Sequence, residues 1–135
     1  MSEKPTMTWN FTKIVFLLND IFTWIGSVIL IGFPTLIFNS FPQVDFSPLM
    51  KELISSGGGI LAGTLAVLSA LVLVGKDLSV KFIKNTTLIM LIFHILGFGG
   101  SFTVGLLISP KIFINALLHT FFIILFVKVL LKNRI

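Results

Sequence analysis

Apolar residues fill this chain in four long stretches that are separated by short polar connections. The charged residues leave uncharged gaps of 24, 23 and 26 residues, and a fourth apolar stretch continues past Lys128. A helix of about 20 apolar residues crosses the hydrocarbon core of a bilayer. Because lipid offers no partners to backbone N–H and C=O groups, each stretch is expected to be helical. The pattern predicts membrane-spanning helices at about 14–38, 53–74, 86–108 and 112–131.

Composition supports this prediction. The chain of 135 residues is 56% hydrophobic and only 11% charged, with a mean hydropathy of +1.08. Soluble domains carry about 25% charged residues, and soluble monomers avoid large exposed apolar patches. The sequence therefore predicts an all-α fold, an integral membrane four-helix bundle with antiparallel up-down topology. Residues 1–135 are expected to form a single transmembrane domain.

Lysine and arginine are unevenly distributed between the predicted loops. Eight of the ten lie in the N-terminal segment, the loop after the second helix and the C-terminal tail, which four spans place on one side. Only Lys51 and Lys111 lie on the other side. The positive-inside rule then predicts that both termini are cytoplasmic. This charge fits anionic lipid headgroups, and no basic domain is present for nucleic acid. Nine lysines to one arginine are typical of an AT-rich bacterial genome, so the bacterial inner membrane is the expected location.

Small residues recur at helical spacing in the second and third predicted spans. Gly59 and Gly63 share one face of the second span, and Gly97 and Gly105 share one face of the third. Helices in lipid associate by close packing at small residues. We expect these glycines to form a helix-packing seam between the second and third helices. A broken helix that coordinates a substrate, as in transporters, is the alternative.

Polar residues inside the predicted spans form three short stripes. The stripes are Asp20, Thr23 and Ser27 in the first span, His94 and Ser101 in the third, and Asn115 and His119 in the fourth. Ionisable groups inside a membrane are costly and normally face the bundle interior. The functional interpretation is a ligand-binding polar pocket in which Asp20 pairs with one histidine. Such a pocket would exchange protons or bind the polar head of an apolar ligand.

A purely structural interpretation of the histidines stays open. Each neutral imidazole would bond a backbone carbonyl, a serine or an asparagine across a helix interface, which contributes about 0.6 kcal/mol on average. A metal site is not predicted, because His94, His119 and Asp20 come from three helices and show no tight ligand spacing.

No phosphate loop, serine-hydrolase elbow, zinc-protease or paired-cysteine motif occurs in the sequence,. The leading hypothesis is a non-enzymatic accessory or lipid/hydrophobic-ligand-binding protein, with membrane lipid and a protein partner or homo-oligomer as partners. One alternative is a membrane redox or quinone-linked enzyme subunit, for which quinone would be the cofactor. The other is an oligomeric channel or transporter.

The order of features also resembles a known family. The first apolar stretch ends in "GFP", the second opens with "KELISSGGGILAG", and two further spans precede a basic tail. This layout is similar to the DoxX-like superfamily of small bacterial four-helix membrane proteins. The residues that match its acidic, glycine-rich helix start are Glu52, Gly57, Gly58, Gly59 and Gly63. The resemblance implies a four-helix membrane fold, in a superfamily whose members are associated with quinone-linked oxidases or have no known activity.

Overall fold

The computed structural model describes residues 9–133, and all of their regular secondary structure is helical. In chain order the elements are α1 (Trp9–Gly32), α2 (Pro34–Asn39), α3 (Pro48–Glu52), the π-helical turn η1 (Leu53–Gly57), α4 (Gly58–Val74), α5 (Val80–Leu107), the short helical turn η2 (Pro110–Ile112) and α6 (Phe113–Lys132). Four stretches are long and apolar enough to cross a membrane: Phe11–Gly32, Pro48–Val74, Val80–Leu107 and Pro110–Lys132. The predicted all-helical fold with four candidate spans is confirmed.

The first predicted helix, 14–38, is wrong at its end. Helix α1 stops at Gly32, and Phe33 leaves the helical conformation with φ −135° and ψ 48° before Pro34 starts α2. Proline lacks a backbone N–H and disfavours a helical residue before it, so a continuous helix through this point is costly.

The other helices begin earlier than the hydropathy pattern predicts, because capping residues set their first turns. Ser47 accepts a hydrogen bond from the Met50 N–H, and Pro48 occupies the first helical position, as its sequence context indicates,. Ser79 caps α5 in the same way through the Phe82 N–H. The second and third spans therefore start at 48 and 80.

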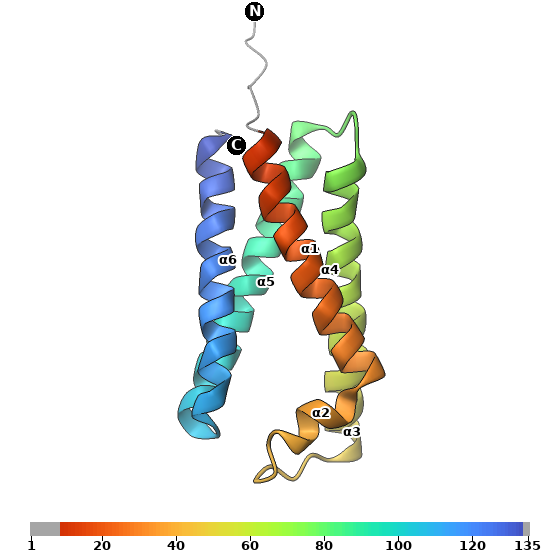
Figure 1. The fold of residues 1–135 in the computed structure, drawn as a ribbon, viewed down its shortest axis with the longest axis vertical. Coiled ribbons are helices and arrows are strands. Elements are labelled where there is room, and N and C mark those ends of the chain that lie inside the picture. Colours follow the sequence, from red (N-terminus) through yellow and green to blue (C-terminus); the bar gives the residue numbers. More distant parts are fainter. Residues whose placement is uncertain (1–8, 134–135) are drawn as a thin grey trace, which may run out of the picture.

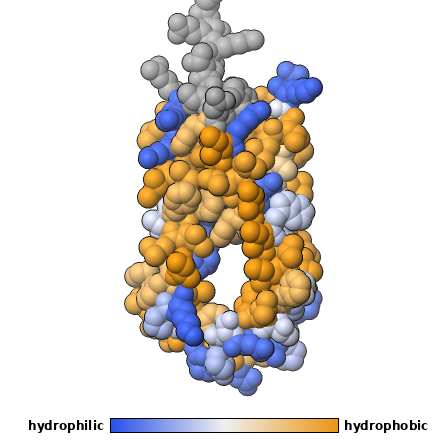
Figure 2. Space-filling view, viewed as in Figure 1, coloured by the Kyte–Doolittle hydropathy of each residue, from blue (hydrophilic) through white to orange (hydrophobic). Residues whose placement is uncertain are grey.

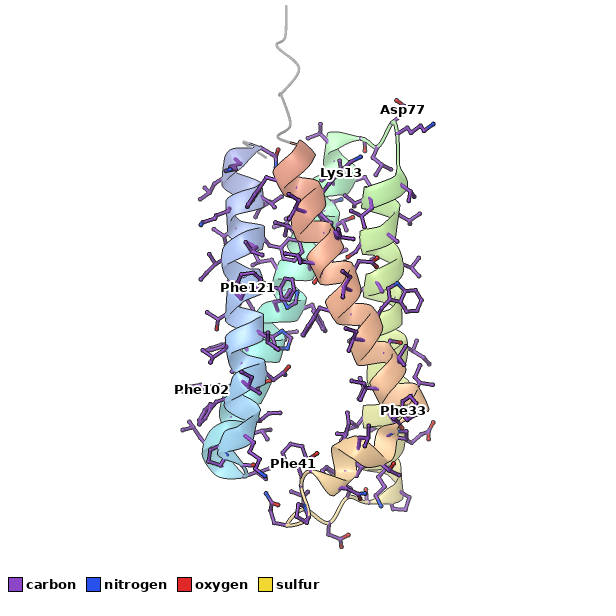
Figure 3. The ribbon with its side chains drawn as sticks, in the orientation of Figure 1. Lys13, Phe33, Phe41, Asp77, Phe102 and Phe121 are labelled. Carbon is purple, nitrogen blue, oxygen red and sulfur yellow. The ribbon has the colours of Figure 1, made fainter. Side chains whose placement is uncertain are left out.

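The helices form two pairs that converge at one end (Figure 1). Helix α1 packs along α4, and α5 packs along α6, whereas α4 and α5 touch only slightly. The pairs meet near the start of α1 and the end of α6 and diverge toward the opposite end. Lys13 and Asp77 lie at the convergent end, and Phe41 lies at the divergent end (Figure 3). The apolar core is Val15, Phe16, Leu65, Val72, Met90, Phe122, Phe126 and Val129.

The glycines do pack closely, but the predicted seam between the second and third helices is wrong. A β-carbon on Gly59 would overlap Ile31 of α1. On the other pair, a β-carbon on Gly97 would overlap the His119 ring, and one on Gly105 would overlap Phe113. Small residues mark a face that can approach another helix closely, but they do not specify the partner. Gly63 likewise faces Ser27 of α1, so each glycine stripe holds its own pair together.

The connection after α2 bridges the two pairs at the divergent end. Gln43 Nε2 donates to the Ile108 carbonyl oxygen at 3.2 Å, which links this connection to the end of α5. The Phe38 and Phe46 rings pack together with centroids 5.1 Å apart. An opening therefore remains between the pairs, bounded by the core at one end and by this bridge at the other. Figure 2 shows it passing through the molecule between mostly hydrophobic walls.

Candidate functional site

A chain of hydrogen bonds links all four long helices at the point where the two pairs converge. Asn19 of α1 donates from Nδ2 to Ser69 Oγ of α4 at 2.8 Å and to the Met90 sulfur of α5 at 3.3 Å. Its Oδ1 lies 2.7 Å from Nε2 of His94, also on α5. Nδ1 of His94 lies 2.8 Å from Nδ1 of His119 on α6. The structure thus joins the two predicted histidines directly.

Phenylalanine rings enclose this polar chain. The His94 ring stacks on Phe122, with centroids 4.7 Å apart and planes at 13°. Phe22 and Phe93 contact the His119 ring with centroids 5.6 and 5.7 Å away. His94 is 0% exposed and His119 is 5% exposed. Hydrogen bonds in such surroundings have no water to replace them, so the geometry of the network is strongly constrained.

A cavity of about 440 Å³ begins beside His119 and occupies the opening between the helix pairs. Its apolar walls come from α1, α2, α4, α5 and η2, through residues such as Leu30, Ile37, Ala62, Phe93 and Ile112, whereas α6 contributes polar residues. The polar lining residues are Thr23, Asn115 and His119. None of the described residues that line it is Lys, Arg, Asp or Glu. The site is therefore a largely apolar, uncharged space with a few polar groups.

The remaining predicted site residues form separate contacts. Ser101 and Asn115 are brought together, because Asn115 Nδ2 donates to Ser101 Oγ at 2.7 Å. Ser27 Oγ donates to the Gly59 carbonyl oxygen at 2.8 Å and so fastens α1 to α4. Thr23 Oγ1 donates to the Asn19 carbonyl oxygen in its own helix. Only Thr23, Asn115 and His119 from the predicted set line the cavity.

The predicted pairing of Asp20 with a histidine is wrong. Asn19, one residue earlier, occupies that position and is fully buried. Successive helix residues point about 100° apart, so Asp20 faces a different direction and is only partly buried. Its Oδ1 makes no hydrogen bond to any residue within 9–133. The polar stripe on α1 was correctly located but assigned to the wrong residue.

Sequence reasoning missed Asn19 and Ser69. Asn19 precedes Thr23 by four residues, so the same helical spacing that groups Asp20 with Thr23 could have pointed to it,. Ser69 lies in the second span, for which no polar stripe was predicted. An uncharged polar residue inside a span was the available signal in both cases.

No three histidine, cysteine, aspartate or glutamate side chains gather as metal ligands in the part of the chain that the structure describes. The Nδ1 atoms of the two histidines are engaged with each other, and His94 Nε2 is engaged with Asn19. Of the four ring nitrogens of these histidines, only Nε2 of His119 makes no hydrogen bond to a described residue. The chemistry that the arrangement offers is therefore hydrogen bonding, to His119 and to the Thr23 and Asn115 side chains, at the edge of an apolar cavity.

Comparison with known proteins adds no relative to this description. No protein-family model, curated protein or solved structure matches the chain. The function is therefore inferred from the network and the cavity.

Proposed function

We propose that this protein is a multi-pass membrane protein that binds a hydrophobic ligand with a small polar head in the cavity between its helix pairs. The observation that carries the proposal is the cavity itself, about 440 Å³ with apolar walls and the buried His119 at its edge. Binding sites for small molecules are typically about 300–1,000 Å³, mostly apolar, with a few placed polar groups.

The opening between the pairs gives such a ligand a route from the bilayer. Its boundaries are helices whose outer surfaces carry large exposed apolar side chains, such as Ile25, Leu96 and Leu117. A ligand dissolved in lipid would enter sideways, without crossing water. The cavity is complete within one chain, so neither a protein partner nor a second copy is required to form it.

Binding explains the site better than catalysis. Among the described residues, His119 is the one titratable side chain that lines the cavity, no carboxylate lines it, and the Thr23 hydroxyl donates to the Asn19 carbonyl oxygen of its own helix. General acid–base chemistry would need a further group within reach of the reacting atoms. We therefore favour ligand binding over a redox enzyme subunit and over a channel or transporter.

We further propose the bacterial inner membrane as the location, with both termini in the cytoplasm. Lys76 and Lys81 flank the loop at the convergent end, and Lys51 and Lys111 belong to the divergent end. Lys4 and Arg134, which the sequence pattern assigns to the cytoplasmic side, lie outside the described residues. In this orientation the cavity occupies the outer half of the bilayer. Membership of the DoxX-like superfamily is a proposal that rests on the helix layout and the glycine-rich start of the second span.

Native mass spectrometry of the full chain, released from lipid nanodiscs made with bacterial lipid extract, tests the binding proposal. The informative variant is Gly26→Leu, because Gly26 lines the cavity and a β-carbon there meets no atom within 4 Å. The new side chain would fill the cavity without first displacing the protein. Gly99→Leu is the matched control, since Gly99 is also a helical glycine with free space but does not line the cavity.

The wild-type chain and Gly99→Leu are expected to retain one lipid-derived molecule at activation energies that strip bulk lipid. Gly26→Leu is expected to lose it while keeping the unfolding transition that the wild-type chain shows after its ligand is removed. Equal retention by Gly26→Leu, or a wild-type chain that carries nothing, would overturn the proposal.

A further inference from the structure

The direction of each hydrogen bond in the network can be assigned from Asn19 outward. The Met90 thioether sulfur and the Asn19 Nδ2 atom are 3.3 Å apart. A thioether sulfur accepts hydrogen bonds and cannot donate them, so the amide nitrogen of Asn19 must face it. The amide oxygen then faces His94 at 2.7 Å. Because an amide oxygen only accepts, Nε2 of His94 must carry a hydrogen and donate.

This assignment propagates to the second histidine. A neutral imidazole has one donor nitrogen and one acceptor nitrogen. Since Nε2 of His94 donates, its Nδ1 accepts, and Nδ1 of His119 must donate across the 2.8 Å contact. The acceptor of His119 is then Nε2, whose lone pair is free. This atom makes no hydrogen bond to a described residue, although His119 is 95% buried and lines the cavity.

The neutral form of the pair follows from its surroundings. Phenylalanine rings contact both imidazoles, and no carboxylate hydrogen-bonds to either of them within 9–133. An unpaired charge in such an apolar environment costs several kcal/mol. The network therefore leaves a hydrogen-bond acceptor, and not a cation, on a side chain that lines the cavity.

We infer that the ligand carries a hydroxyl group, as an alcohol or a phenol does, and that this hydroxyl donates to Nε2 of His119. The inference rests on the proposed function and specifies its ligand class. A head that can only accept, such as an ether, an ester or a ketone, meets a lone pair there and leaves it unpaired. An anionic head would find no cation among the described residues that line the cavity. The apolar body of the ligand lies along the walls that α1, α4 and α5 provide.

The test compares two probes that differ only in this hydrogen bond. Hexadecanol and its methyl ether have the same chain, but only the alcohol has a donor. Binding of each to the full chain in nanodiscs is measured by native mass spectrometry titration. Because the ether leaves the buried acceptor without a partner, the alcohol is expected to bind about tenfold more tightly, which corresponds to about 1.4 kcal/mol. A phenol with an alkyl tail, paired with its methyl ether, shows whether aliphatic or aromatic hydroxyls are preferred.

Two variants assign the discrimination to His119. His119→Phe removes the acceptor and is expected to bring alcohol and ether to equal affinity. Thr103→Val removes a helical hydroxyl that does not line the cavity, and is expected to preserve the difference. Nitrogen-15 spectra of histidine-labelled wild-type protein provide a readout that needs no variant. The Nε2 resonance of His119 should report an unprotonated nitrogen, and it should shift with the alcohol but not with the ether.

The outcomes distinguish failure of the hydroxyl inference from failure of the proposed ligand binding. Tighter binding of both hydroxyl probes, or of one of them, than of the matching ether supports the inference. Equal binding of alcohols and ethers overturns the hydroxyl inference and leaves ligand binding in the cavity intact. A wild-type chain that binds none of the four probes contradicts both proposals. A protonated Nε2 in the ligand-free spectrum would also overturn the hydroxyl inference.

Discussion

Replacing Asn19 by leucine is expected to weaken the junction of all four helices, because this one side chain bonds to two of the other three. Its Nδ2 donates to Ser69 Oγ of α4, and its Oδ1 accepts from His94 of α5. Leucine has a similar size, so the substitution removes polar partners without opening a large cavity. The loss of unfolding free energy therefore reflects the missing hydrogen bonds more than a change in packing.

The expected loss of stability depends on whether Ser69 and His94 can find other hydrogen-bond partners in the variant. Ser69 can rotate its hydroxyl toward a carbonyl of its own helix, so its loss is near the membrane average of about 0.6 kcal/mol. Nε2–H of His94 has no such alternative, because the ring is stacked on Phe122 and fully buried. An orphaned buried donor costs about 1–3 kcal/mol. The free energy of unfolding should fall by about 2–4 kcal/mol.

Equilibrium unfolding in mixed micelles, followed by circular dichroism, measures this change. Asn115→Leu is the matched control: Asn115 makes one side-chain bond, to Ser101, and is only partly buried. It should cost about 0.6 kcal/mol or less. If the Asn19→Leu variant is no less stable than Asn115→Leu, the network does not hold the helices together and the reasoning is refuted.

Two further predictions use other positions. Gly97→Ala should lower stability by about 1–3 kcal/mol, because the new β-carbon overlaps the His119 ring,. Gly99→Ala, with no atom within 4 Å, should be neutral or slightly stabilising in the same assay,; equal losses would contradict the close packing. For topology, the chain has no cysteine, so Asp77→Cys and Asp45→Cys can be labelled without background. In intact bacteria a membrane-impermeant maleimide should label only the Asp45→Cys variant, and the reverse pattern would refute the proposed orientation.

The spans could be predicted from sequence because the hydropathy of successive residues adds up over each long stretch. Long uncharged stretches give four helices whatever the helices pack against, and local signals such as Ser47–Pro48 mark a boundary correctly,. The break at Phe33 was equally visible as the "GFP" tripeptide, but the hydropathy pattern outweighed it. Hydropathy does not detect a proline that ends a helix inside an apolar run.

The pairing of the helices and the partners within the hydrogen-bond network depend on how each helix is rotated about its axis and on which helix lies beside it. The residue pattern of one helix does not determine either. His94 and His119 were predicted as site residues because each is an ionisable residue inside an apolar span. Their direct contact could not be predicted, because it depends on α5 lying beside α6. Asp20 was preferred over Asn19 because charge in a membrane is more conspicuous. Side chains of successive helix residues point about 100° apart. Asn19, the residue that bonds His94, was therefore not among the predicted site residues, although it is next to Asp20.

Photo-crosslinking tests most directly whether the space between the helix pairs holds a ligand. A long-chain alcohol carrying a diazirine in its tail is added to the protein in nanodiscs with excess unlabelled lipid, and the modified residues are mapped by mass spectrometry. Crosslinks are expected at cavity residues such as Leu30 and Phe93, and the excess lipid should not compete them away. Labelling confined to outward-facing residues such as Ile92 and Leu117, and lost on competition, would contradict the account.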